Sequence, residues 1–143
     1  MKIKGVKKIL KIKHPSIKSL VLKCDTVFSR YKRLSNAKTN GDVKCFTCGK
    51  QDEIGKMDCG HYISRIYKTV RWDEQNTEPQ CPSCNRFHEG KKDVFALKLQ
   101  EKYGRDILEE LNRRKNKVHK FTIPELNELY EYYKDKVREL ENG

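Results

Sequence analysis

The stretch CFTCGKQDEIGKMDCGHYISRIYKTVRWDEQNTEPQCPSCN, residues 45–85, begins with one Cys-x-x-Cys pair and ends with a second pair followed by an asparagine. Two residues between thiolates let one tight turn present both sulfurs to the same ion, and two such turns complete a tetrahedral site. We therefore predict a structural Zn²⁺ bound by Cys45, Cys48, Cys81 and Cys84. A closed site of this kind has no open coordination position, so the zinc should stabilise the fold and take no part in catalysis.

The 32 residues between the two pairs must contain structure of their own. Residues 56–64, KMDCGHYIS, have the alternation and aromatic content of a strand, and a returning strand or loop can follow within 65–80. Residues 85–92, NRFHEGKK, can form a short helix. The cysteine region therefore predicts a hairpin followed by a helix, closed by the two knuckles.

The segments on either side of the cysteine region have helical periodicity. Apolar residues recur at helical spacing over 16–38, 93–104 and 105–114. A further helix over 122–140 opens with a capping box, Thr122 with Glu125. We expect the apolar stripe of this last helix to pack within the domain, with a dimer contact as the alternative.

Positive charge is concentrated at the N-terminal end. The net charge is +12, and residues 1–44 carry 13 basic and 2 acidic side chains, whereas the other 99 residues are close to balance. Such asymmetry indicates a polyanionic partner, and DNA is favoured over an anionic membrane face or a merely soluble surface. The residues that we expect to contact nucleic acid are Lys7, Lys8, Lys11, Lys13, Arg30 and Arg33.

The chain has neither an apolar run of membrane-spanning length nor the apolar region of a secretory signal. We therefore expect a cytoplasmic protein with reduced cysteines and no membrane partner. Cys59 has no partner in either knuckle, so we interpret it as a small buried thiol, and Cys24 as part of a helix core.

A hairpin and helix closed by two cysteine knuckles resemble the ββα-metal, or HNH, nuclease motif. His61 is followed after 15 residues by Asn76, and Asn76 after 9 residues by Asn85, directly behind Cys84. The resemblance implies that His61 is the general base, that Asn76 fixes the hairpin, and that Asn85 binds a catalytic divalent ion.

The wider pattern is similar to the phage lambda NinG family, also called Rap. The similarity rests on CGHY, RWDEQNTEPQCPSCN, the following Gly90 and FTIPELNELYEYYKDKVREL, within residues 40–143. It implies an HNH-type endonuclease that acts on branched DNA such as Holliday junctions, in the cytoplasm of a phage or prophage host. The expected fold class is α+β, with a basic arm and helix (1–40), a zinc-stapled ββα-metal core (41–92) and a C-terminal helical region (93–143).

The chemistry of phosphodiester hydrolysis supports the same residues. A neutral imidazole can take a proton near pH 7, which suits His61. Mg²⁺ or Mn²⁺ bound by few protein ligands leaves positions for phosphate and water. Asn85 supplies a side-chain oxygen, and on a helix starting there His88 and Glu89 would share its face, so either is a further candidate ligand.

Asp58 is the carboxylate nearest to His61 and a candidate ligand of the catalytic ion. Many HNH nucleases have Asp or His immediately before the base, whereas this chain has Gly60. Strand alternation alone would put Asp58 and His61 on opposite faces, so Asp73 and Glu89 remain open as the carboxylate.

Two other functions fit parts of the pattern. A non-catalytic zinc-ribbon protein that binds nucleic acid would have the same charge and cysteines, but His61 would have no task. An HNH endonuclease that acts on linear duplex DNA would share the site without a preference for branches. Because a symmetric junction needs two cuts, a homodimer is the expected form of a junction-cutting enzyme.

Overall fold

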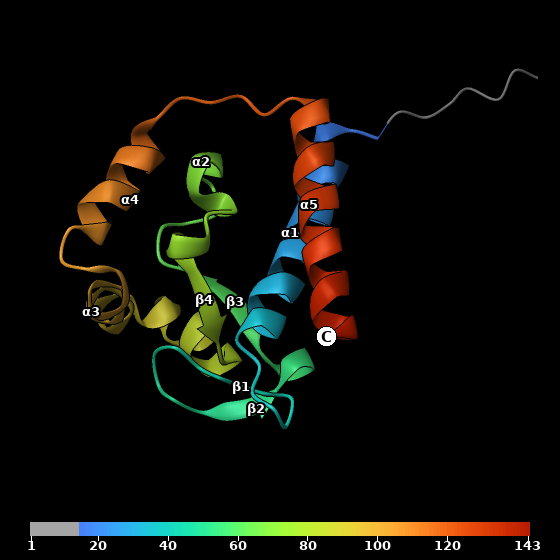
Figure 1. Cartoon of the computed structure of the whole chain (residues 1–143). Coiled ribbons are helices and arrows are strands. Elements are labelled where there is room, and N and C mark those ends of the chain that lie inside the picture. Colours follow the sequence, from blue (N-terminus) through green and yellow to red (C-terminus); the bar gives the residue numbers. More distant parts are fainter. Residues whose placement is uncertain (1–14) are drawn as a thin grey trace, which may run out of the picture.

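A computed structural model describes residues 15–143 of the chain. The described part contains five helices and two small antiparallel sheets (Figure 1). The helices are α1 (Ile17–Ser35), α2 (Lys68–Arg71), α3 (Lys92–Tyr103), α4 (Ile107–Asn116) and α5 (Ile123–Asn142). The strands are β1 (Asp42–Lys44), β2 (Gln51–Glu53), β3 (Asp58–His61) and β4 (Thr77–Gln80). This mixed architecture agrees with the expected α+β class.

Helix α1 begins where its cap predicts. The Ser16 hydroxyl accepts a hydrogen bond from the Ser19 amide at 3.1 Å. The helix ends at Ser35, three residues before the expected end at 38, because the Asn36 amide bonds back to the carbonyls of the last turn. The Asn36 side chain also donates to the Lys32 carbonyl at 2.7 Å.

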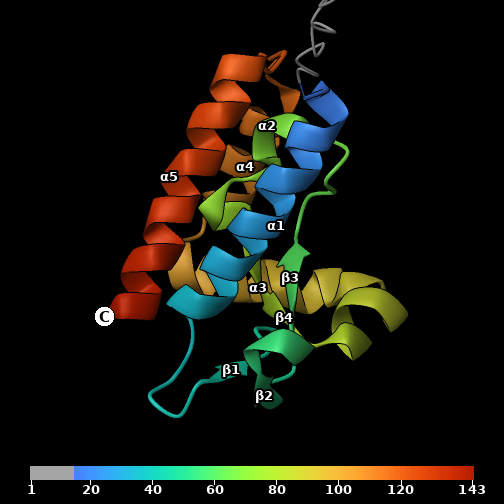
Figure 2. The same ribbon diagram turned by 90° about the vertical axis from the view of Figure 1, so that its right-hand side faces the viewer.

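Helices α1 and α5 lie side by side in two perpendicular views (Figures 1 and 2). Phe28 of α1 meets Tyr133 of α5 edge to face, with ring centroids 4.9 Å apart. Cys24 is fully buried and its thiol donates to the Leu126 carbonyl at 3.3 Å. The expected packing of the last helix within the domain is confirmed, as are the core position of Cys24 and the capping box, in which Glu125 N donates to Thr122 Oγ1.

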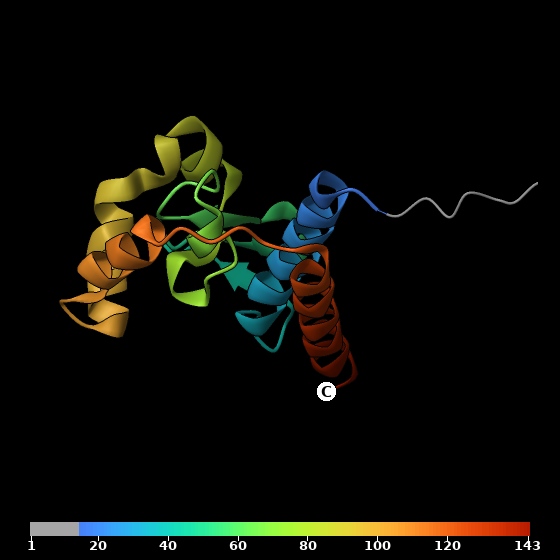
Figure 3. The same cartoon turned by 90° about the horizontal axis from the view of Figure 1, so that it is seen from above.

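The second hairpin forms the centre of the fold. Strands β3 and β4 pair antiparallel, with Asp58 opposite Gln80 and His61 opposite Thr77. The strand expected within 56–64 and its returning partner within 65–80 are therefore confirmed. Seen from above, α1 and α5 lie on one side of this hairpin and α3 and α4 on the other (Figure 3).

The segment after the second knuckle differs from the expected single helix. A π-helical turn covers Ser83–Phe87, and Glu89, Gly90 and Lys91 then take positive φ angles before α3 starts. Such angles interrupt a right-handed helix. The premise that His88 and Glu89 share a helical face with Asn85 is therefore wrong. Helix α3 ends as expected, at Gly104, whose φ of 100° stops it.

Candidate functional site

The four knuckle cysteines converge at one point. Their sulfur atoms all lie within 4.8 Å of one another, and those of Cys48 and Cys81 are 3.7 Å apart. Tetrahedral zinc with Zn–S bonds of about 2.3 Å separates its sulfurs by about 3.8 Å. The four cysteines could therefore bind a zinc ion. The first knuckle follows β1 and the second follows β4, so an ion there would tie the two sheets together.

The surroundings of Cys45 favour its thiolate form. Burial acts to raise the pKa of Cys45, but the Thr47 hydroxyl and the backbone amides of Cys81, Cys48 and Thr47 outweigh it and lower that pKa to about 6. Thiolate is the form of cysteine that binds metal. Burial raises the pKa of Cys48 and raises that of Cys81 to about 12, so a bound cation is what would stabilise their thiolates.

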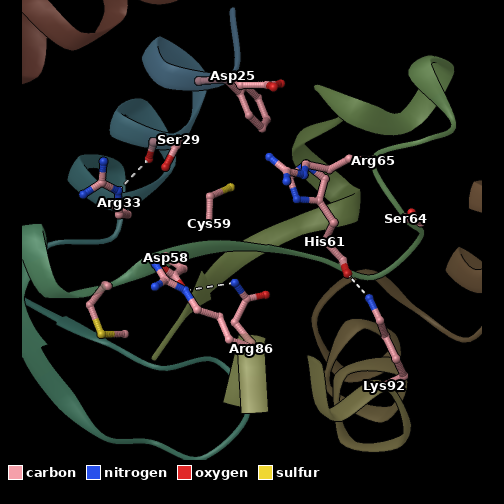
Figure 4. A pocket seen from close by; sticks show the side chains of 13 residues that line it. Asp25, Ser29, Arg33, Asp58, Cys59, His61, Ser64, Arg65, Arg86 and Lys92 are labelled. Atoms are coloured by element: carbon pink, nitrogen blue, oxygen red, sulfur yellow. Dashed lines mark hydrogen bonds and ion pairs between the residues drawn. The ribbon is translucent and has the colours of Figure 1, made fainter. Parts of the chain in front are cut away.

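A cleft of about 670 Å³ opens between α1, β3 and the π-helical turn (Figure 4). Three of the predicted site residues line it together: His61, Asp58 and Asn85. Four basic side chains also line it within the described part of the chain, namely Arg33, Arg65, Arg86 and Lys92. An anionic ligand such as a phosphodiester matches this charge.

His61 is held in one tautomer by the backbone. Its Nε2 lies 2.8 Å from the Arg71 carbonyl oxygen. Because a carbonyl only accepts, Nε2 carries the hydrogen and Nδ1 is the acceptor in the neutral ring. Burial is the main cause that lowers the pKa of His61 to about 4, with Arg65 acting in the same direction. The imidazole is therefore neutral at pH 7 and able to accept a proton.

The carbonyl that orients His61 is fixed by α1. The Arg71 guanidinium donates to both carboxylate oxygens of Asp25, at 2.8 and 2.5 Å. The Trp72 indole donates to the same carboxylate at 3.0 Å. Sequence reasoning missed Asp25 and Arg71, because the pair is separated by 46 positions and belongs to no local motif.

Asn76 is fully buried and fixes the loop that follows His61. Its side chain accepts from the Ile63 amide at 2.8 Å and donates to the carbonyls of Ile63 and Val70 at 3.0 and 2.9 Å. These bonds connect the two arms of the hairpin beyond the strands. Asn76 thus occupies the position expected of a residue that orients the hairpin, away from the cleft itself.

Asp58 of β3 accepts hydrogen bonds from two residues of the π-helical turn, Asn85 and Arg86. Asn85 Nδ2 donates to Asp58 Oδ2 at 3.0 Å, and the Arg86 guanidinium donates to both Asp58 oxygens at 2.8 and 2.6 Å. The Arg86 side chain is 63% exposed. A cation that entered here would meet one carboxylate and one amide side chain and would compete with an exposed guanidinium.

Asp58 and His61 both line the cleft, although strand alternation places them on opposite faces of β3. Strand β3 pairs with β4 alone among the described strands, and two-stranded ribbons twist strongly. Side chains from both faces of so short a strand can therefore reach one cleft. The Cys59 thiol lines it too, and burial raises the pKa of this group to about 12.

The other carboxylate and imidazole candidates lie elsewhere. Asp73 caps a turn through Gln75 N and forms an ion pair with Arg114 at 2.9 Å. His88 and Glu89 are exposed, and neither is among the residues that line the cleft.

The structure explains the glycine that precedes His61. A Cβ at Gly60 would lie 2.0 Å from Oε1 and 2.6 Å from Cδ of Gln80. The fully buried Gln80 amide donates to Thr47 Oγ1 at 3.1 Å and to the Gly90 carbonyl at 2.9 Å. Gly60 thus leaves room for the Gln80 side chain, which links Thr47 of the first knuckle to Gly90, just before α3.

Two of the six predicted nucleic-acid contacts, Arg30 and Arg33, lie within the described residues. Arg33 lines the cleft, whereas Arg30 forms an ion pair with Glu141 at the end of α5. The predicted contacts Lys7, Lys8, Lys11 and Lys13 lie outside the described residues. Sequence reasoning missed Arg65, Arg86 and Lys92, which carry no motif and reach the cleft only through folding.

Comparisons with known proteins identify a family. A family model described as Bacteriophage Lambda NinG protein matches residues 2–143. Curated relatives named Protein ninG from Escherichia phage 933W, Escherichia phage lambda and Salmonella phage P22 are each 28% identical over 103 residues, 71% of this chain. The chain spans about half the length of the curated relatives it matches. No solved structure matches.

Among residues 15–143, no helix has both the length and the apolarity needed to cross a membrane.

Proposed function

The chain belongs to the NinG family of bacteriophage proteins, and from that premise we propose that it is a metal-dependent DNA endonuclease of phage recombination that cuts branched DNA such as Holliday junctions. The observation that carries the proposal is the meeting of His61, Asp58 and Asn85 in one basic cleft. These are an acceptor imidazole, a carboxylate and an amide, supplied by β3 and by the turn behind the second knuckle.

The general base in this mechanism is Nδ1 of His61. The Arg71 carbonyl holds the hydrogen on Nε2, so Nδ1 has the lone pair that takes a proton from the attacking water. The low pKa keeps this lone pair available at neutral pH.

Asp58 and Asn85 would hold the catalytic ion, and His88, which lies outside the cleft, is not retained as a ligand. When bound, Mg²⁺ or Mn²⁺ supplies a Lewis acid that stabilises charge on the phosphate and the departing 3′-oxygen. Arg86 would release Asp58 to the ion and turn toward a phosphate, as its exposure allows. Arg65, Arg33 and Lys92 neutralise the flanking backbone, so affinity for DNA should fall steeply with salt.

The structural role belongs to the cysteine site. Zinc held by the two knuckles would clamp the β3–β4 hairpin against the turn that carries Asn85, which keeps the two sides of the cleft in register. A symmetric four-way junction needs two cuts, so we propose that the enzyme acts as a homodimer on DNA in the host cytoplasm.

The decisive experiment compares a four-way junction with a linear duplex of the same sequence, each with Mg²⁺, with Mn²⁺ and without added divalent ion. Wild type should cut the junction only with the ion, and His61→Ala should lose cutting by a factor of ~100 or more while still binding the junction. His119→Ala is the matched control, because this exposed imidazole pairs with Glu125 and does not line the cleft.

The outcomes separate the two alternatives. Equal cutting of junction and duplex would favour an HNH endonuclease that acts on linear DNA. Tight DNA binding by wild type with no cutting under any ion would favour a non-catalytic zinc-ribbon protein. Unchanged cutting by His61→Ala would remove the catalytic assignment of this residue.

A further inference from the structure

A second hollow, of about 650 Å³, adjoins the basic cleft on the side of α2 and α4. Ser64 and Lys92 line both cavities, so the two share a wall. The second hollow is mainly apolar, with Tyr62, Ile63 and Tyr67 on one side and Leu108 of α4 on the other. We propose that it receives an unstacked nucleobase from the DNA strand whose phosphate lies in the basic cleft. This inference rests on the proposed function, because it takes the cleft as the phosphate site.

The lining of the hollow has the chemistry that a base requires. Aromatic rings and apolar side chains contact the faces of any base, whereas polar groups at the rim meet its edges. Tyr67 is 38% exposed, and the polar rim includes Asn112, Lys115 and one carboxylate, Glu109. Lys115 Nζ lies over one face of the Tyr67 ring, 4.5 Å from its centroid, so a base that stacks on Tyr67 would take the other face or displace the ammonium.

Contacts with neighbouring elements hold the walls of the hollow in place. Tyr62 packs against the fully buried Phe95 with ring centroids 6.0 Å apart. The Thr69 hydroxyl donates to the Lys115 carbonyl at 3.3 Å, which ties α2 to the end of α4. A wall built in this way is preorganised, so a base that enters does not have to order it.

The position of the hollow explains why branched DNA would be preferred. In a continuous duplex every base is stacked and paired, so none is free to enter. At a branch or fork, bases next to the exchange point can leave the stack at low cost. A phosphate in the cleft would then place the adjoining base beside the shared wall of Ser64 and Lys92.

Photo-crosslinking with the wild-type chain tests the contact directly. A splayed-arm duplex has 5-iododeoxyuridine at successive unpaired positions, and binding is measured without added divalent ion, so no cleavage is needed. We expect one or two positions nearest the fork to crosslink to the peptides that contain Tyr62 or Tyr67. Crosslinks that map only to other peptides would overturn the proposal.

Substitutions give an independent measurement. Tyr67→Ala should weaken binding of the splayed duplex ~tenfold while changing blunt-duplex affinity less than twofold, and Tyr67→Phe should keep wild-type affinity for both. Tyr132→Ala is the matched control, because Tyr132 is an exposed tyrosine on α5 outside both cavities. Equal losses on both DNAs, or no loss on either, would overturn the base site. Failure of the endonuclease proposal would appear instead as absent cutting by wild type, which leaves these binding differences measurable.

Discussion

His61 donates its Nε2 hydrogen to the Arg71 carbonyl at 2.8 Å, and the Arg71 guanidinium donates to both carboxylate oxygens of Asp25 in α1. The tautomer of the candidate base is therefore decided by a helix that precedes the cysteine region in the sequence. The first 40 residues do more than add charge, since α1 also forms one wall of the cleft.

The first prediction concerns pH. Folding lowers the pKa of His61 from 6.5 to about 4, mainly by burial, so folding favours the neutral ring. The stabilisation is complete above pH 6.5 and is lost as pH falls toward 4. Between pH 7 and 5 the free energy of unfolding should fall by about 2 kcal/mol more in wild type than in His61→Gln.

Urea unfolding at pH 7 and at pH 5 measures this difference. Protonation of the cysteine thiolates affects wild type and variant equally, so it cancels when the two proteins are compared. Asp25, Arg65 and Arg71 also act on the ring and are unchanged in the variant. His88→Gln, at an exposed position without an ion pair among the described residues, should retain the wild-type pH dependence. If His61→Gln kept the wild-type pH dependence of stability, the lowered pKa would not belong to His61. In the same way, the acidic limb of cleavage should lie near pH 4 and not near 6.5.

The second prediction concerns Asp25→Asn. Both side chains of the Asp25–Arg71 pair are only 15% exposed, so breaking it should cost about 3 kcal/mol of stability. A loosened Arg71 carbonyl should lower kcat about tenfold with little change in KM. Long-range ¹H–¹⁵N spectra of the His61 ring should report a mixture of tautomers.

Asp106→Asn, at an exposed helix end, is the control for Asp25→Asn and should leave all three readouts unchanged. A single Nε2–H tautomer in Asp25→Asn with wild-type kcat would mean that α1 does not position the base. Because the spectra need no DNA, the tautomer readout does not depend on whether the chain cuts it.

The third prediction concerns the cysteine cluster. Cys84→Ser should abolish stoichiometric zinc binding and lower Tm by about 10 °C or more, since binding free energy at such a site is folding free energy. Cys59→Ser should keep one zinc per chain, because Cys59 lies outside the cluster. Metal content and thermal unfolding followed by circular dichroism check both variants, and full zinc in Cys84→Ser would refute the site.

The fourth prediction concerns Gly60. Gly60→Ala should cost about 2 kcal/mol, because the added methyl overlaps a Gln80 side chain that is fully buried and held by two hydrogen bonds. In a Gln80→Ala background the same change should cost much less, which a double-mutant cycle measures. Gly55→Ala, where a Cβ meets nothing within 4 Å, is the control. Equal costs in both backgrounds would rule out the clash.

Local patterns in the sequence were sufficient for the elements and for the metal site. The paired Cys-x-x-Cys turns, the Ser16 cap, the Thr122 capping box and the stop at Gly104 each depend on a few neighbouring residues, and all lie where the sequence predicts them. The HNH-like spacing identified His61 and Asn85 as candidates, closeness to His61 in the sequence identified Asp58, and the three residues line one cleft.

Only the tertiary structure decided which distant groups surround that site. The ion pair of Asp25 with Arg71, the Gln80 side chain against Gly60, the break that separates His88 from Asn85, and the apolar hollow beside α4 have no local signature. The reason is physical: a cap or a metal knuckle is satisfied within one turn of chain, whereas these contacts join segments that meet only after the helices have packed on both sides of the hairpin.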